Sequence, residues 1–276
     1  MNNMEEYTYM IESADGKQIK RLIALQTKSK VRDEQQMFVA EGLRMCREIP
    51  DELLIKAYIS ESFYKKIKEG NGDGGELPED FFDNKDYEIV SDKVFEKVSK
   101  TMTPQGILTV AKQPHYSFEK MIDEGKKTIL FVEDIRDPGN LGTIIRTAEG
   151  ADVDGIVMSK GTVDIFNPKV IRSTMGAIFR VPFVYVDDIK DSIVRAKKEK
   201  ISFYAAHLKG ENDYAAIKYD KRCAVLIGNE ARGLSDEVSK LADSLVKIPM
   251  TGQVESLNAS IAAAVFMYEI YRQRRF

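Results

Sequence analysis

Three groups of polar and glycine residues in the C-terminal half of the chain follow predicted strands and could take part in chemistry. In chain order they are Asn140 with Arg146, the segment 228–233, and Ser256 with Asn258. Glycines around a charged residue at the carboxyl end of a buried strand let the backbone approach a ligand. The second group, in which Gly228 and Gly233 surround Glu230, therefore indicates a ligand-binding loop.

Each group alone also has an ordinary structural explanation. Pro138–Asn140 favours a tight turn, and Arg146 could lie on a solvated helix face. Ser235 could cap the helix after the second group, and Ser256 or Asn258 could cap the last helix. Capping alone is a poor explanation for three such groups after successive strands, so together they favour one shared site.

The strands that must position these residues are apolar runs separated by helical stretches. The run at 128–135 is nearly continuous, as is typical of a parallel strand buried on both faces. Comparable runs recur at residues 155–159, 183–186, 202–206, 224–229 and 244–249. The pattern predicts a doubly wound α/β domain over residues 128–276. Its last helix should carry Leu257, Ile261, Ala264, Val265, Tyr268 and Tyr271 on one face.

Residues 17–113 alternate between helix and strand patterns, which predicts a second, smaller α/β domain. Within it, Asp92 is expected to cap a helix. Residues 1–16 are expected to form a flexible leader, and residues 114–127 a polar linker. A literal GxGxxG at 70–75 has no buried strand before it, so a plain surface loop is expected there.

Composition excludes several classes of protein. The chain has 276 residues, of which 43% are hydrophobic and 31% charged, as in an ordinary globular protein of one or two domains. Its net charge of −3 can still conceal a basic face. Two distant cysteines and two histidines argue against a disulfide framework and a metal site. Without a membrane-spanning run or a signal peptide, the sequence predicts a reduced, cytoplasmic protein.

Together, the three groups resemble the motifs of the SpoU (TrmH-type) family of SPOUT-class RNA ribose 2′-O-methyltransferases. The matching residues are Asn140, Arg146 and Ala148 in the first motif, Gly228, Asn229, Glu230 and Gly233 in the second, and Ile248, Pro249, Met250, Ser256, Leu257 and Asn258 in the third. Residues 28–49 and 103–112 also resemble the family's substrate-binding domain, an RNA-binding fold like that of certain ribosomal proteins.

The resemblance implies an α/β fold in which a parallel-sheet SPOUT domain is tied in a deep trefoil knot and follows the small RNA-binding domain. It implies S-adenosyl-L-methionine as the cofactor, RNA as the partner, and a homodimer with its sites near the interface. Aromatic residues on more than one side of the last helix, among them Phe266 and Tyr268, also favour a dimer. The implied cofactor contacts are Gly228, Asn229, Ile248, Met250 and Leu257.

The implied catalytic residues are Arg146, Asn140, Glu230, Ser256 and Asn258. Methyl transfer to a ribose hydroxyl requires alignment of the reacting atoms and removal of a proton. A guanidinium stays charged and is a poor base. We therefore expect first that Arg146 binds the target phosphate and stabilises the developing alkoxide. Proton abstraction by a neutral Arg146 is the second expectation, and the other four residues would hold Arg146 and the ribose.

The N-terminal domain is expected to find the RNA. Between Lys17 and Glu48 there are eight Lys and Arg residues against four acidic ones, a local excess that fits phosphate binding. A merely solvated helix face is the alternative. The expected RNA contacts are Lys28, Lys30, Arg32 and Arg44.

The resemblance thus implies S-adenosylmethionine-dependent methylation of a ribose 2′-hydroxyl in structured RNA, with large-subunit ribosomal RNA favoured by the N-terminal domain. A transfer RNA ribose methyltransferase is one alternative. A catalytically silent RNA-binding or ribosome assembly protein is the other, against which the complete set of motif residues argues. The target nucleotide is not encoded in any residue pattern of the sequence.

Overall fold

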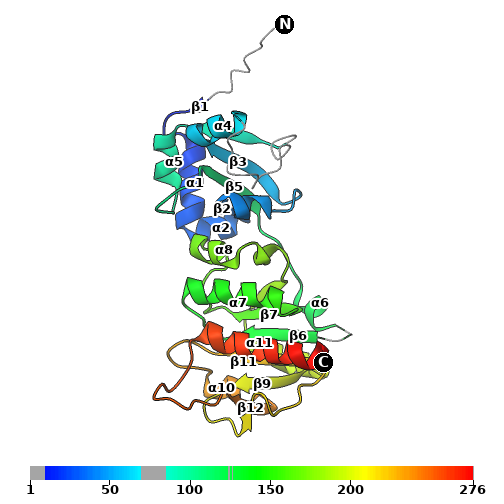
Figure 1. Ribbon diagram of the computed structural model, residues 1–276. Coiled ribbons are helices and arrows are strands. Elements are labelled where there is room, and N and C mark those ends of the chain that lie inside the picture. The colour runs from blue at the N-terminus through cyan, green and yellow to red at the C-terminus, as the bar shows by residue number, and fades with distance from the viewer. Residues whose placement is uncertain (1–9, 70–84, 124, 126, 276) are drawn as a thin grey trace. The chain divides into compact units, whose positions relative to one another are not determined.

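The computed structural model describes residues 10–69, 85–123, 125 and 127–275, and the chain divides into two compact units (Figure 1). The first comprises Met1–Pro114 and Phe166–Gly176, and the second His115–Ile165 and Ala177–Phe276. Phe166–Gly176 groups with the first unit, where the ring of Phe166 lies 5.0 Å from the ring of Phe38. The GxGxxG sequence at 70–75 lies outside the described residues.

The first unit contains a mixed sheet with the strand order β1-β4-β3-β5-β2. Its strands are β1 Met10–Ile11, β2 Met37–Glu41, β3 Leu54–Ser60, β4 Tyr87–Val90 and β5 Ile107–Lys112. Its helices are α1 Lys17–Thr27, α2 Ser29–Gln35, α3 Leu43–Arg47, α4 Glu61–Lys68, α5 Asp92–Val98 and α8 Pro168–Thr174. Ile19, Leu22 and Leu25 recur at helical spacing and pack α1 into the core. The predicted small α/β domain is confirmed.

Two details of the first unit differ from expectation. Met10 and Ile11 are not part of a loose leader, because they pair with Ile89 and Val90 as the edge strand of the sheet. Ser91, not Asp92, caps α5, since its side chain accepts a hydrogen bond from the N–H of Val94. Asp92 instead lies in the first turn, where an acidic side chain is favourable.

The second unit contains an all-parallel sheet with the strand order β10-β12-β9-β11-β6-β7-β8. Its strands are β6 Lys127–Val132, β7 Gly155–Ser159, β8 Phe183–Val186, β9 Ser202–Ala206, β10 Asn212–Asp213, β11 Arg222–Ile227 and β12 Ser244–Lys247. Its helices are α6 Phe118–Ile122, α7 Pro138–Gly150, α9 Ile189–Lys198, α10 Asp236–Ser239 and α11 Ala259–Arg275, with a 3-10 turn at Ala177–Phe179. The predicted doubly wound domain is confirmed.

The order of these strands brings distant loops to one edge of the sheet. β11 lies between β6 and β9, while β12 lies on the other side of β9. Because all four strands are parallel, the segments that follow them meet at the carboxyl edge, the usual place for a ligand in such sheets. The trefoil knot implied by the resemblance stays a prediction.

Helices cover both faces of this sheet. Ile129 and Phe131 of β6 pack with α6, α9 and α10 in one core cluster. Since side chains alternate along a strand, Leu130 and Val132 face the other side. There α7 packs beside α11, which buries Phe266, Met267 and Ile270 (Figure 1). None of the described helices combines the length and apolarity needed to cross a membrane.

The expected linker contains a helix that belongs to the core of the second unit. Phe118, Met121 and Ile122 of α6 are each less than 8% exposed and join the cluster around Phe131. Their spacing of three and four residues is that of one helix face, although Pro and charged neighbours give the segment the composition of a linker. Ser117 caps this helix through a hydrogen bond from the N–H of Lys120.

Candidate active site

The segment after β11 forms a tight hairpin that closes on itself. Asn229 and Gly233 exchange backbone hydrogen bonds of 3.0 and 2.9 Å, and the side-chain oxygen of Asn229 accepts from the N–H groups of Ala231 and Arg232. A Cβ on Gly228 would lie 2.1 Å from the carbonyl carbon of Gly233. Gly228 is therefore required first by the hairpin itself, rather than only by the approach of a ligand.

Glu230 projects from this hairpin and connects it to the segment after β6. Its carboxylate accepts hydrogen bonds from the backbone N–H groups of Arg136 and Asp137 and from the side-chain amide of Asn140 at 3.0 Å. Burial acts to raise the pKa of Glu230, but these donors outweigh it and hold the pKa below its ordinary value. Glu230 is thus an anion that fixes two loops to each other.

Asn140 extends this link to the third motif. It lies in the first turn of α7, which begins at Pro138 and is capped by Asp137, so the expected tight turn at Pro138–Asn140 is wrong. Proline has a backbone suited to the first position of a helix, which explains the difference. The side-chain oxygen of Asn140 accepts a hydrogen bond of 2.9 Å from the amide of Asn258.

Asn258 completes the network and begins α11. Its side-chain oxygen accepts from the N–H of Ser260 at 2.8 Å and from the N–H of Ile261 at 3.4 Å, so Asn258 is the helix cap and Ser256 is not. Glu230, Asn140 and Asn258 therefore form one hydrogen-bonded chain, which we call the Glu230 network. It joins segments that are about a hundred residues apart in sequence.

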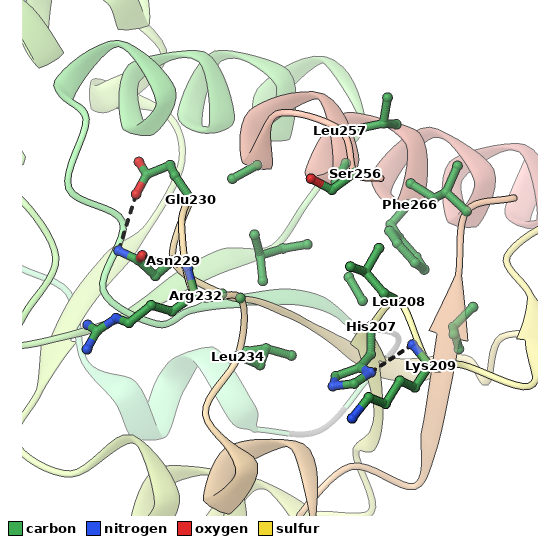
Figure 2. A pocket seen from close by; sticks show the side chains of 18 of the residues that line it. His207, Leu208, Lys209, Asn229, Glu230, Arg232, Leu234, Ser256, Leu257 and Phe266 are labelled. Atoms are coloured by element: carbon green, nitrogen blue, oxygen red, sulfur yellow. Dashed lines mark hydrogen bonds between the residues drawn. The ribbon is translucent and has the colours of Figure 1, made fainter. Parts of the chain in front are cut away.

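A cavity of about 300 Å³ lies beside this network (Figure 2). It is lined by the ends of β9, β11 and β12 and by the start of α11. All five expected cofactor contacts line it, namely Gly228, Asn229, Ile248, Met250 and Leu257, together with Glu230 and Ser256. The three motifs thus contribute to one cavity or to the network that borders it.

Sequence reasoning missed part of the lining. Ala206 ends β9 and is followed by His207, Leu208 and Lys209, while Leu234 and Phe266 contribute apolar side chains. The strand at 202–206 was predicted, and the rule that ligands bind at the carboxyl ends of parallel strands applies to it as well. That rule, rather than any motif, could have found the segment after β9.

Arg146 and Ser256 do not join the network. Arg146 lies on the exposed side of α7, opposite the buried Leu141, Ile145 and Ala148, and makes no hydrogen bond or ion pair with the described residues. Arg146 is six positions after Asn140, which places the two on different sides of a helix. Ser256 is exposed at the rim of the cavity.

The expected RNA contacts of the first unit divide into two kinds. Lys28, Lys30 and Arg44 are exposed, and Lys30 lies 3.8 Å from Glu34. Arg32 is only 4% exposed, and its guanidinium donates a hydrogen bond of 2.7 Å to the carbonyl of Leu25 in the last turn of α1. The expectation that Arg32 binds RNA is therefore wrong, because its charge closes a helix end inside the unit.

Neither cysteine is placed to act as a nucleophile, and the described residues contain no cluster that could bind a metal ion. Burial raises the pKa of Cys46 to about 12 and that of Cys223 to about 11, so neither is a ready nucleophile. Within the described ranges no three His, Cys, Asp or Glu side chains gather in a way that could hold a metal ion.

Comparison with known proteins identifies the class and then the family. The profile of the SpoU rRNA methylase family matches residues 127–268, and that of the MRM3-like substrate binding domain matches residues 16–109. The fold is that of an AdoMet-bound rRNA methyltransferase from Sinorhizobium meliloti, with a TM-score of 0.82, 28% identity, and coverage of 97% of this chain and 98% of that one. The chain belongs to the SpoU rRNA methylase family, and the resemblance predicted from its motifs is confirmed.

Two further relatives agree with this assignment. The 23S rRNA (guanosine(2553)-2′-O)-methyltransferase RlmP of Bacillus subtilis is 33% identical over 94% of this chain and 98% of its own length. The SpoU methyltransferase AviRb from Streptomyces viridochromogenes shares the fold with a TM-score of 0.78, at 21% identity, over 94% of this chain and 98% of that one.

Proposed function

We propose that this protein transfers a methyl group from S-adenosylmethionine to a ribose 2′-hydroxyl of large-subunit ribosomal RNA. The observation that carries the proposal is that the Glu230 network joins all three motif segments and borders a cavity lined by the second and third of them. Ribosomal RNA is favoured as the substrate by the first unit, whose residues 16–109 match a substrate-binding domain of this family. On this proposal the protein acts where ribosomes assemble, in the cytoplasm.

The cavity has the volume, apolar surface and negative charge that S-adenosylmethionine requires. Its volume of about 300 Å³ is at the lower end of the range for small-molecule sites. Ile248, Leu257 and Phe266 offer apolar surface for an adenine ring, while Glu230 at the border supplies negative charge for a sulfonium. Gly228, Asn229 and Met250 complete the wall that would hold the cofactor.

The chemistry of the bound cofactor is to supply an electrophilic methyl carbon; the residues of the chain align and activate the acceptor. The Glu230 network would keep the three loops in register, so that the ribose oxygen is held in line with the methyl group. Ser256, exposed at the cavity rim, would contact the ribose.

Arg146 would act on the RNA rather than on the cofactor. Its guanidinium lies on the solvent side of α7 without a partner among the described residues, so it is available to a phosphate. We assign it the bidentate binding of the target phosphate and stabilisation of the alkoxide that forms as the hydroxyl loses its proton. A neutral arginine acting as the base is the second choice.

The first unit would hold the RNA through exposed cations. Lys28, Lys30 and Arg44 keep this role in the proposal, and Arg32 is removed from it. The division of labour remains that of the expected domains, with residues 17–113 for RNA and residues 128–276, tied in a deep trefoil knot, for methyl transfer.

A homodimer is also part of the proposal. Besides its buried face, α11 carries apolar side chains on the exposed side: Ile261 is 49% and Tyr268 50% exposed, and Val254 before the helix is 62% exposed. A lone surface helix needs only one apolar stripe. Replacing Ile261 and Tyr268 together by lysine should turn a dimer into a monomer in light scattering; a wild-type monomer at micromolar concentration would refute the dimer.

The decisive experiment maps ribose methylation in RNA from cells with and without this protein. Loss of one 2′-O-methyl mark in large-subunit RNA, restored by purified protein with S-adenosylmethionine, is the expected result. Loss of a mark in transfer RNA would move the substrate to the alternative class. Failure of the purified protein to bind S-adenosylmethionine in calorimetry would indicate a silent RNA-binding protein.

A further inference from the structure

The segment after β9 forms a rigid part of the cavity wall that the proposed function does not use. The N–H of His207 donates to the carbonyl of Val246 at 2.9 Å, and the N–H of Gly210 donates back to the carbonyl of His207 at 2.9 Å. A Cβ on Gly210 would lie 2.7 Å from the backbone N of Lys247, so the chain is pressed against β12. His207 and Lys209 are therefore held at fixed positions beside the cavity.

The hydrogen bonding of His207 fixes which ring nitrogen can donate. The backbone N–H of Lys209 donates to Nδ1 of His207 at 3.1 Å (Figure 2). A nitrogen that accepts carries no proton, so the proton of the neutral ring is on Nε2. In Figure 2 the ring of His207 and the side chain of Lys209 extend in the same direction from one short loop.

Lys209 differs from the other charged groups of the cavity wall in its lack of a partner. Glu230 is engaged by four donors, two from the backbone and two from the side chains of Asn140 and Asn229, and Arg232 lies 3.7 Å from Asp134. The ammonium of Lys209 makes no hydrogen bond or ion pair with the described residues. His207 and Lys209 lie on the opposite side of the cavity from Glu230 (Figure 2), so the ammonium of Lys209 is separated from that carboxylate.

S-adenosylmethionine carries a sulfonium, an ammonium and a single anionic group, the carboxylate of its amino-acid half. A free cation beside an N–H donor attracts a carboxylate and repels the other two groups. We infer that His207 and Lys209 form the carboxylate-binding end of the cofactor cavity, with Nε2–H of His207 and the ammonium of Lys209 donating to the two carboxylate oxygens. This inference rests on the proposed function, because it concerns the orientation of the same cofactor.

The test compares two ligands that share the adenosine half. S-adenosylhomocysteine has the amino-acid carboxylate, whereas 5′-methylthioadenosine lacks the whole amino-acid half. In calorimetry at low salt, Lys209→Met should weaken S-adenosylhomocysteine about five- to tenfold, as expected for an exposed charge-assisted hydrogen bond. The affinity for 5′-methylthioadenosine should change less than about twofold. Lys198→Met, an exposed lysine of α9 outside the cavity, is the matched control and should change neither.

Two substitutions of His207 separate its two nitrogens. His207→Asn keeps an acceptor for the N–H of Lys209 but places no donor at the Nε2 position, so it should weaken S-adenosylhomocysteine about two- to fivefold. His207→Gln places an N–H donor near that position and should restore most of the affinity. A structural role alone would give the opposite order, because only asparagine keeps the backbone contact.

The outcomes divide cleanly. If Lys209→Met weakens the affinity for both ligands equally, the lysine contacts the adenosine half of the cofactor. If it changes neither affinity, the lysine does not contact the cofactor and is free to bind RNA. Either result overturns the inference. If the wild-type protein binds neither ligand, the proposed function fails, which is a different result from a changed ratio of the two affinities.

Discussion

Glu230 in the second unit and Arg32 in the first unit are both charged side chains held by hydrogen bonds, but their hydrogen bonds connect different parts of the fold. Glu230 accepts from residues about ninety positions earlier in the chain and fixes two loops beside an open cavity. Arg32 donates to Leu25, seven residues away, and closes the end of a neighbouring helix. The first arrangement builds a site, whereas the second stabilises a local fold.

The difference follows from where the topology places each residue. Glu230 and Asn140 come after β11 and β6, which are adjacent parallel strands, so their loops must meet. Arg32 lies on α2, directly after α1, where a nearby cation can satisfy the last carbonyl groups of the preceding helix. A charge at a parallel strand end therefore indicates function more strongly than a charge within a basic helical run.

The largest expected effect comes from Arg146, which stands outside the Glu230 network. Arg146→Ala should lower the rate of methyl transfer by about a hundred- to a thousandfold, because the cation that would stabilise the developing alkoxide is lost. The affinity for S-adenosylhomocysteine should stay the same, since Arg146 does not line the cavity. Single-turnover methylation and calorimetry on the same preparation measure both. Loss of cofactor binding would mean that Arg146 belongs to the cofactor side.

Breaking the Glu230 network should have the next largest effect. Glu230→Ala leaves the amide of Asn140 and two backbone N–H groups without their acceptor, so the loops should lose their register and methyl transfer should fall roughly ten- to a hundredfold. Thr143→Ala, an exposed position of α7 outside the network, is the control and should retain activity. Normal activity of Glu230→Ala would show that the three loops hold their places without the carboxylate.

The same carboxylate predicts a pH dependence of stability. The pKa of Glu230 is lowered in the folded protein, so its stabilising effect is complete above the ordinary glutamate pKa of about 4.3 and is lost as the pH falls through the lowered value. Wild type and Glu230→Gln should differ in free energy of unfolding by about 1 kcal/mol at neutral pH, since the group is partly exposed and screened. Urea titrations should show this difference shrinking below about pH 4. A gap that widens on acidification would contradict the sign.

Much of the second unit could be predicted from the sequence, because its strands are apolar runs buried on both faces and its motifs sit at their ends. The Glu230 network follows from that placement. The cap at Asn258 could not be chosen over Ser256, since both residue types cap helices equally well. His207 and Lys209 match no motif, so only the rule that ligands bind at the carboxyl ends of parallel strands could have indicated that they line the cavity.

In the first unit, the prediction of RNA contacts depended on composition, which does not tell which basic residues are exposed. A count of basic residues cannot distinguish Arg32 from Lys30, although one is buried and the other exposed. The same limitation applies to α6 of the second unit. Its charged neighbours have the composition of a linker, although Phe118 and Met121 are spaced as on one helix face. Burial is decided by the partner surface, which a local pattern does not contain.

The lysines of the basic segment should have a moderate effect on RNA binding. If Lys28 and Lys30 each contact one phosphate, replacing both by alanine should flatten the slope of log affinity against log salt by about one and a half to two units. Lys66→Ala with Lys93→Ala removes the same charge from exposed positions elsewhere in this unit and is the matched control. If both double variants show the same salt slope, Lys28 and Lys30 lie on a solvated helix face and do not contact RNA phosphates.

Arg32 provides the smallest expected effect on RNA and the sharpest test of the comparison. Arg32→Ala removes a donor from the carbonyl of Leu25 in the interior, so the free energy of unfolding should fall by about 1–3 kcal/mol. The salt slope for RNA binding should remain that of the wild type at temperatures where the variant is folded, because a side chain that is 4% exposed cannot release a counterion from the RNA. Arg32→Lys separates charge from geometry: a lysine keeps the charge but lacks the guanidinium fork, so it should recover only part of the stability. A slope that falls by a full unit in Arg32→Ala, without a change in stability, would mean that Arg32 leaves the interior to meet the RNA, and the distinction between the two regions would fail.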